Sequence, residues 1–278
     1  MNLSSVEELK SFLKNSHLRP KDYLGQNFLV DEEILQGIME EAEIKPTDLI
    51  LEVGPGLGTL TEELLKRGAR ITAIEKDEKL IPILNKNLKK YPNAKIISGD
   101  ILRFNLSNQI SGSYKVVANI PYYLTSKLFQ YFLEQKNKPE SLILMVQKEV
   151  GERVTATAGE LSILGISVQV YADAEIILDV PKTSFWPVPE VDSVVLKIIP
   201  KLKYPNLKDE KLFFRILKIA FAGKRKQIHN TLASGLKLSK EEVNDLLKKA
   251  GIEPTTRPQD VSIDQWIELS LQVPNYML

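Results

Sequence analysis

The chain has 278 residues, of which 43% are hydrophobic and 26% charged, and its formal net charge is +1. This composition is globular and argues against disorder, and the length suits one large domain or two smaller ones. The absence of cysteine excludes disulfides, thiolate-held clusters and a cysteine nucleophile, and two histidines far apart lead us to expect no metal site. No apolar run is long enough for a membrane span or a signal peptide, so we expect a cytoplasmic protein with no membrane partner.

The first 42 residues predict a helix, a loop and a second helix. Residues 3–15 have the spacing of an amphipathic helix, and residues 31–42 form the second one. Residues 18–31 are too polar for a strand and too rich in glycine and proline for a helix, so we predict a loop anchored by buried apolar side chains. The amides of Gln26 and Asn27 could contact a ligand there, or could only cap a turn.

A glycine-rich turn follows the first predicted strand, within Leu-Ile-Leu-Glu-Val-Gly-Pro-Gly-Leu-Gly58. The apolar run 49–53 is typical of a buried strand. Gly54, Gly56 and Gly58 lack Cβ atoms, so the backbone can approach a ligand closely. Dehydrogenases, methyltransferases and purely structural turns all use such corners, so the turn alone assigns no function.

Strands and helices then alternate along the chain. Strands are predicted at 70–75, 94–98, 114–119 and 141–147, and helices at 77–90 and 126–134. This alternation predicts an α/β fold with a mostly parallel, doubly wound sheet. Ligands bind at the carboxyl ends of the strands in such sheets. Because the glycine turn, Glu75, Asp100 and residues 119–122 all follow strand ends, we predict one ligand site there.

The remaining sequence predicts a hairpin and a helical domain. Residues 172–180 and 191–199 are typical of strands that add an antiparallel hairpin to the sheet, and residues 161–170 could be a helix or a strand. Helices are predicted at 209–222, 224–234, 239–250 and 262–273. We therefore divide the chain into an α/β domain, 1–200, and a small all-α domain, 201–278.

The helical domain carries the excess of positive charge. Residues 1–200 hold 23 basic and 27 acidic side chains, whereas residues 201–278 hold 14 basic and 9 acidic ones. A basic segment on a mildly acidic body indicates a polyanionic partner, although a solvated lysine-rich helix face has the same composition.

Two acidic residues favour a nucleoside cofactor without a pyrophosphate. Glu75 can accept hydrogen bonds from both hydroxyls of a ribose. Asp100 suits an adenine amino group and would repel a pyrophosphate. The glycine spacing also differs from G-x-G-x-x-G. S-adenosyl-L-methionine fits this pattern, with its amino-acid part at the glycine turn.

The segment Asn119-Ile-Pro-Tyr122 is the catalytic candidate. An adenine N6 is a poor nucleophile because its lone pair is delocalised into the ring. The Asn119 side-chain oxygen and the Ile120 carbonyl could accept both amino hydrogens, Pro121 would fix the turn, and Tyr122 would offer a stacking face. Such chemistry depends on proximity and orientation. The alternative is an ordinary β-turn at a strand end.

Together these motifs resemble those of the ribosomal RNA adenine N6,N6-dimethyltransferases, specifically the bacterial small-subunit dimethyladenosine transferases. The resemblance extends from Arg19 to about Trp266. Besides the motifs above, it rests on Gly-Gln-Asn-Phe-Leu29, Phe-x-Pro-x-Pro-x-Val-Asp-Ser193 and a basic Phe-Ala-Gly-Lys-Arg-Lys226 segment. It implies a Rossmann-like methyltransferase domain and a helical RNA-binding domain. It also implies S-adenosyl-L-methionine as cofactor and two adjacent adenosines near the 3′ end of 16S rRNA, in the assembling small ribosomal subunit, as substrate. We expect a monomer.

The resemblance also implies roles for single residues. Cofactor contacts would come from Gln26, Asn27, Leu29, Gly54, Gly56, Glu75, Lys76, Asp100, Ile101 and Asn119. RNA contacts would come from Arg19, Lys21, Lys224, Arg225 and Lys226. Phe185 would stack on the flipped target base opposite Tyr122, which would offset the cost of extracting that base. His229 stands where relatives commonly have arginine, and residues 1–16 could be only a structural cap.

Three other functions stay open on the sequence. Large-subunit rRNA dimethyltransferases share most of these motifs, although the Phe-x-Pro-x-Pro and Phe-Ala-Gly-Lys-Arg-Lys segments favour the small-subunit enzyme. A second possibility is a non-catalytic RNA-binding assembly factor of the same fold, which the intact 119–122 segment argues against. A dehydrogenase is the third.

Overall fold

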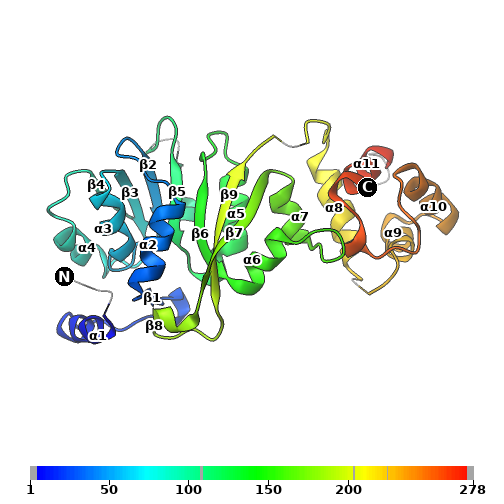
Figure 1. Ribbon diagram of the computed structural model, residues 1–278. Helices are drawn as coiled ribbons and strands as arrows, with labels where there is room; N and C mark the ends of the chain where they lie inside the picture. Colours follow the sequence, from blue (N-terminus) through cyan, green and yellow to red (C-terminus); the bar gives the residue numbers. More distant parts are fainter. Residues whose placement is uncertain (1–4, 107–108, 203, 224, 274–278) are drawn as a thin grey trace. The chain divides into compact units, whose positions relative to one another are not determined.

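The computed structural model describes residues 5–106, 109–202, 204–223 and 225–273. They form two compact units (Figure 1). The first unit comprises the described residues up to 151 and residues 173–200, and the second comprises residues 152–172 and the described residues from 201 onward. The expected boundary after residue 200 coincides with one of these breaks. Residues 152–172, which the sequence places with the sheet, group instead with the C-terminal helices.

The first unit is built around a seven-stranded sheet in the order β4-β3-β2-β5-β6-β9-β7. Its strands are β2 (Leu49–Val53), β3 (Arg70–Glu75), β4 (Ala94–Ser98), β5 (Lys115–Asn119), β6 (Leu142–Gln147), β7 (Ala172–Val180) and β9 (Ser193–Pro200). Strands β2 to β6 pair in parallel, and β9 runs antiparallel to β6. The predicted Rossmann-like, mostly parallel sheet with an antiparallel hairpin is confirmed.

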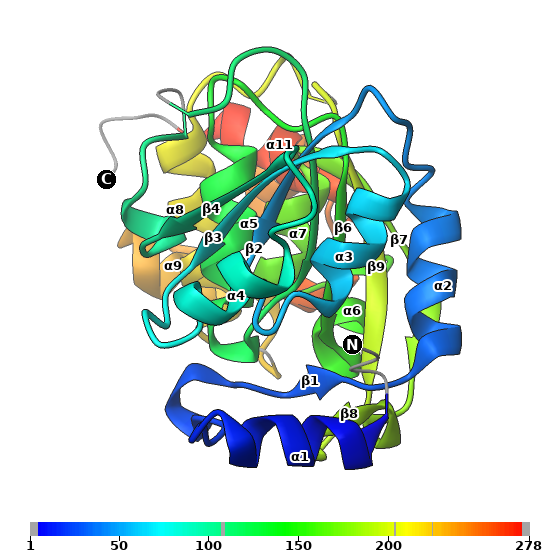
Figure 2. The ribbon, with the colours of Figure 1, turned by 90° about the vertical axis from the view of Figure 1, so that its left-hand side faces the viewer.

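Helices cover both faces of the sheet, as parallel strands require. Helices α2 (Glu32–Glu41), α3 (Thr59–Lys66) and α4 (Ile81–Asn87) lie on one face, and α5 (Thr125–Leu133) lies on the other (Figures 1 and 2). Residues 142–146 of β6 are consequently at most 2% exposed. Helix α4 is shorter than the predicted helix at 77–90, because residues 77–80 form a turn closed by a bond from Leu80 N to Asp77 O.

The predicted loop at 18–31 contains a short strand, so that prediction was incomplete. Strand β1 (Phe28–Leu29) pairs antiparallel with β8 (Phe185–Trp186), and Leu29 lies opposite Phe185. Helix α1 (Val6–Asn15) runs beside this two-stranded sheet (Figure 2) and buries Leu9 and Leu13 in the core. A strand of two residues has no alternation to detect. The β1–β8 pairing directly joins two motifs that are far apart in the sequence, Gly-Gln-Asn-Phe-Leu29 and Phe-x-Pro-x-Pro-x-Val-Asp-Ser193.

The second unit packs helices around its own hydrophobic core. They are α7 (Ile163–Gln169), α8 (Glu210–Phe221), α9 (Ile228–Leu236), α10 (Lys240–Lys249) and α11 (Ile263–Gln272). Buried Phe213, Leu232 and Trp266 belong to this core. The ambiguous residues 161–170 therefore contribute a helix. None of the helices in the described part of the chain has both the length and the hydrophobicity needed to cross a bilayer.

Two further helices, α9 and α6, differ from what the sequence predicts. Helix α9 begins at Ile228 and not at residue 224, because Lys226 N donates to Gly223 O at 2.8 Å and closes a turn before the helix. Arg225 lies in the same turn. Helix α6 (Lys148–Thr155), which follows β6 directly, has no counterpart among the predicted elements.

Candidate active site

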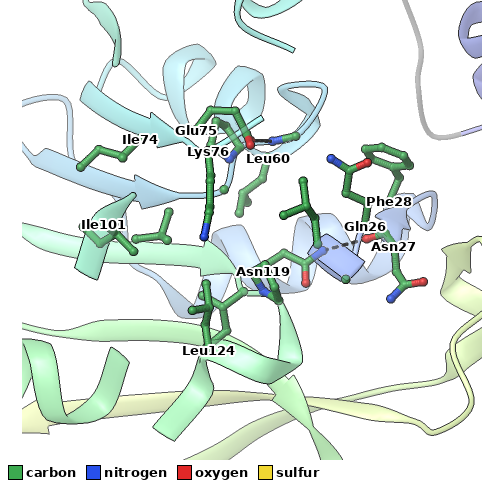
Figure 3. A pocket seen from close by; sticks show the side chains of 18 of the residues that line it. Gln26, Asn27, Phe28, Leu60, Ile74, Glu75, Lys76, Ile101, Asn119 and Leu124 are labelled. Atoms are coloured by element: carbon green, nitrogen blue, oxygen red, sulfur yellow. Dashed lines mark hydrogen bonds between the residues drawn. The ribbon is translucent and has the colours of Figure 1, made fainter. Parts of the chain in front are cut away.

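The carboxyl ends of β2, β3 and β5 open into one cavity of the first unit (Figure 3). Its volume is about 990 Å³ including the open mouth. Thirteen of the predicted cofactor and catalytic residues line it: Gln26, Asn27, Leu29, Gly54, Gly56, Glu75, Lys76, Asp100, Ile101, Asn119, Ile120, Pro121 and Tyr122. The convergence expected at the strand ends is therefore present.

The glycine turn forms one wall of the cavity. Gly54, Gly56 and Gly58 have φ angles of +68°, +61° and +91°, which a residue with a Cβ adopts only under strain. A Cβ on Gly56 would also come within 3.4 Å of the Phe28 ring. The turn therefore depends on glycine for its conformation.

Glu75 ties the end of β3 to this turn. Its Oε2 accepts a hydrogen bond from Gly56 N at 3.0 Å, and its Oε1 accepts one from Asp77 N at 2.7 Å. Burial raises the pKa of Glu75, although these backbone donors oppose the shift. A carboxylate has about four acceptor positions, so each oxygen can still accept a ligand hydroxyl.

Asp100 is engaged on both of its oxygens. Oδ2 lies 2.9 Å from Lys76 Nζ, and Oδ1 accepts a bond from Leu102 N at 3.1 Å. The bond from Lys76 lowers the pKa of Asp100 against the effect of burial. The Lys76 side chain is 49% exposed, so this ion pair is weak and a ligand can displace the ammonium group.

Gln26 and Lys21 both bind Asp77, which sequence reasoning did not single out. Gln26 Nε2 donates to Asp77 Oδ2 at 3.0 Å, and Lys21 Nζ donates to Asp77 Oδ1 at 2.7 Å. Gln26 Oε1 accepts from Lys21 N at 2.9 Å. Both ends of the Gln26 amide are thus used within the protein, and the Lys21 ammonium group is paired.

Asn119 lines the cavity, and its side-chain oxygen has no hydrogen-bond partner among the described residues. Its Nδ2 donates to the backbone oxygen of Asn27 at 3.3 Å (Figure 3). That bond fixes the amide plane and leaves Oδ1 to accept hydrogen bonds from a ligand. Ile120 is buried, and Pro121 holds its φ at −57° before the short helix Tyr122–Leu124.

Tyr122 and Phe185 lie in different surroundings. Tyr122 lines the cavity, and its Oη lies 2.8 Å from the Oγ of fully buried Ser193. Burial raises the pKa of Tyr122, so the phenol stays neutral. Phe185 is only 1% exposed, packs in the core and does not line the cavity. The structure therefore does not bring its ring to the open site.

The predicted RNA contacts differ in accessibility. Arg19 is exposed in the first unit, and Arg225 and Lys226 are exposed in the second. Lys224 lies outside the described residues. The Nδ1 atom of His229 is buried and has no hydrogen-bond partner among the described residues.

Sequence reasoning missed Asp77 and Ser193 as supports of the site. Each carried a weak signal: Asp77 stands two residues beyond Glu75, and Ser193 ends the Phe-x-Pro-x-Pro motif. Neither lines the cavity, and only the folded structure shows which side chains they hold.

The sequence and the fold match known rRNA methyltransferases. Residues 17–273 match the family model described as ribosomal RNA adenine dimethylase. The ribosomal RNA small subunit methyltransferase A of Dehalococcoides mccartyi (strain CBDB1) is 42% identical over 97% of this chain and 94% of its own length. The protein of the same name from Alkaliphilus metalliredigens is 39% identical over 97% of each chain.

Two solved structures agree with this. A dimethyladenosine transferase from Plasmodium falciparum has a TM-score of 0.72 and 27% identity, covering 85% of this chain and 94% of its own. The 23S rRNA methyltransferase ErmE has a TM-score of 0.70 and 28% identity, covering 88% of this chain and 99% of its own. The chain therefore belongs to the ribosomal RNA adenine dimethylase family and is an rRNA adenine dimethyltransferase.

Proposed function

We propose that this enzyme transfers methyl groups from S-adenosyl-L-methionine to N6 of two adjacent adenosines in the 3′-terminal hairpin loop of 16S rRNA. The product is N6,N6-dimethyladenosine in the assembling small subunit, and the enzyme acts as a cytoplasmic monomer. The observation that carries the proposal is the single cavity that joins Glu75 and Asp100 to the Asn119–Tyr122 segment. The two relatives described above, both named for the small subunit, are 42% and 39% identical to this chain, and ErmE is 28% identical, which supports 16S over 23S rRNA.

The residues in the cavity fit S-adenosyl-L-methionine. Glu75 would accept hydrogen bonds from the ribose, and Asp100 would accept one from the adenine amino group after Lys76 moves away. The glycine turn would hold the amino-acid part, because Gly54 and Gly56 line the cavity without side chains and so present their backbone to a ligand. When bound, this cofactor supplies a methyl group activated by a positively charged sulfur.

Asn119 and Ile120 would activate the target amine. The free Oδ1 of Asn119 and the Ile120 carbonyl would accept hydrogen bonds from the two N6 hydrogens. This favours a tetrahedral nitrogen whose lone pair is no longer delocalised into the ring. The residues contribute by orientation and not by forming a covalent bond, and water can take the proton from the product.

Tyr122 and Phe185 would stack on the flipped base. The bond to Ser193 holds the Tyr122 ring in place. Phe185 must leave the core to reach the base, so its role requires a rearrangement near the β1–β8 pair when RNA binds. Arg19, Arg225 and Lys226, which are exposed, would contact phosphates. Lys21 could do so only after release from Asp77, and Lys224 is proposed on sequence alone.

The test is transfer of radiolabelled methyl from S-adenosyl-L-methionine to unmodified small subunits, with large subunits and free 23S rRNA in parallel. We expect label as N6,N6-dimethyladenosine only in 16S rRNA. Label in 23S rRNA would overturn the choice of substrate. Cofactor binding without label in any RNA would favour a non-catalytic assembly factor.

A further inference from the structure

Residues 21–27, which we call the strap, contribute part of the wall of the cavity. Leu24, Gly25, Gln26 and Asn27 line the cavity directly. Figure 3 shows Gln26 and Asn27 beside Asn119 at the carboxyl ends of the strands. Any ligand that fills the cavity therefore lies against the strap, and the position of the strap affects how the ligand enters and leaves.

Burial does not hold the strap in place. No strap residue whose exposure is described is buried, and Tyr23 is 75% exposed. The chain becomes buried only beyond the strap, at Leu29 and Val30, which are 7% and 9% exposed. Segments with few buried apolar contacts open at low free energy. The strap is thus anchored in the core at its C-terminal end and depends on polar contacts elsewhere.

Asp77 supplies polar contacts to both ends of the strap. Its two oxygens bind Lys21 Nζ and Gln26 Nε2, and Gln26 Oε1 accepts from Lys21 N, so the three residues close a ring of hydrogen bonds. Asp77 is 5% exposed. Burial alone would raise the pKa of Asp77, but the bonds from Lys21 and Gln26 bring it below its ordinary value. The carboxylate stays charged and the ring stays intact at neutral pH.

The C-terminal part of the strap rests on the Asn119–Tyr122 segment. Gly25 has a φ of +62°, and a Cβ there would lie 3.3 Å from Pro121 Cβ. Asn119 Nδ2 donates to Asn27 O at 3.3 Å. The strap therefore crosses from the end of β3, at Asp77, to the end of β5, at Asn119.

We propose that Asp77 is a positioning residue that latches the strap over the cavity and so controls how fast the cofactor is released. Asp77 does not line the cavity and acts through Lys21 and Gln26. The role of Gln26 is then to connect the strap to its latch. The proposal rests on the proposed function, because it takes S-adenosyl-L-methionine as the occupant of the cavity.

A local effect on Glu75 is the competing explanation for any Asp77 variant. Asp77 Oδ1 also accepts a bond from Lys79 N at 3.1 Å, and Asp77 N donates to Glu75. Substitutions on the strap side separate the two explanations. Lys21→Met and Gln26→Leu remove the latch and leave the contacts of Asp77 with Lys79 and Glu75 unchanged.

The experiment measures the rate constant for release of S-adenosyl-L-methionine by stopped flow, and its Kd by calorimetry, both without RNA. Loss of one hydrogen bond of ordinary net strength predicts about a tenfold faster release for Gln26→Leu and for Lys21→Met. The double variant Lys21→Met/Gln26→Leu has already lost the latch. Adding Asp77→Asn to it should therefore change the rate of cofactor release little further. Lys21→Arg should release the cofactor as slowly as the wild-type enzyme. The matched control is Lys86→Met, on the exposed surface of α4.

Amide hydrogen exchange supplies an independent readout. The strap amides of Lys21, Leu24 and Asn27 are hydrogen-bonded within the strap. They should exchange faster in the latch variants without cofactor, while the sheet amides are unchanged. The proposal would be overturned if both Gln26→Leu and Lys21→Met released the cofactor with rate constants within twofold of wild type and their strap amides exchanged at the wild-type rate. Failure of the wild-type enzyme to bind the cofactor would instead overturn the proposed function.

Discussion

Replacing Glu75 by glutamine tests the cofactor site with a minimal change of shape. Both oxygens of Glu75 accept backbone N–H groups, from Gly56 at 3.0 Å and from Asp77 at 2.7 Å. Glutamine retains one acceptor oxygen, so its NH₂ group must face one of the two donors. The variant therefore disturbs the junction of the glycine turn with β3 and, in the proposed complex, would present a neutral amide to the ribose.

The expected loss follows from these contacts. A hydrogen bond to a charged group contributes about 1.5–3 kcal/mol, and leaving a donor against a donor adds to the cost. We expect Glu75→Gln to weaken binding of S-adenosyl-L-methionine by about 2–3 kcal/mol, or about 30- to 150-fold in Kd.

Isothermal calorimetry without RNA measures this loss directly. The control is Glu140→Gln, which neutralises an exposed carboxylate in the same unit that does not line the cavity. Circular dichroism confirms that both variants fold. The expected weakening of cofactor binding is at least about 2 kcal/mol. A Kd for Glu75→Gln within about threefold of the wild-type value would therefore refute the assignment of Glu75 to the cofactor.

Other perturbations test the remaining parts of the account. Ser193→Ala and Tyr122→Phe remove the same hydrogen bond, so each should slow single-turnover methyl transfer about five- to tenfold. The double variant should be no slower than either single variant. Additive losses would show that the two residues act separately. Burial raises the pKa of Glu52 from 4.5 to about 8, so the folded protein holds a proton that the unfolded chain releases. Relative to Glu52→Gln, the free energy of unfolding of the wild-type protein should therefore fall by up to about 1.4 kcal/mol per pH unit between the two pKa values. Denaturant unfolding measures both free energies at pH 5.5 and at pH 8. If the difference between the two proteins is the same at both pH values, that pKa is contradicted. Reversing the charge of Arg225 and Lys226 should weaken RNA binding and flatten the plot of log affinity against log salt by about 0.7–0.9 per lost phosphate contact; an unchanged slope would remove them from the interface.

The strands and the convergence of the site follow from local features of the sequence. Buried parallel strands such as 142–147 are continuous apolar runs, and the special residues at their carboxyl ends meet at one edge of the sheet. Glu75, Asp100 and Asn119 could therefore be placed in a common site before any coordinates were known.

The partners of the polar side chains could not be predicted. Lys21 meets Asp77 across 56 residues, and nothing in the local sequence distinguishes this lysine from one that contacts RNA. The β1–β8 pair is equally hidden, because a two-residue strand has no period. It is this pair that joins Leu29 to Phe185 and leaves the Phe185 ring in the core.

The proposed mechanism depends on activation of an adenine amine by the Asn119–Tyr122 segment, next to the cofactor. Its most direct test is the single-turnover rate constant of Asn119→Ala on unmodified small subunits, with cofactor and RNA saturating. In the proposed mechanism Asn119 Oδ1 acts chiefly in the transition state, so we predict a fall of at least about 100-fold with only a modest change in cofactor Kd. A rate constant close to that of the wild-type enzyme would contradict the account.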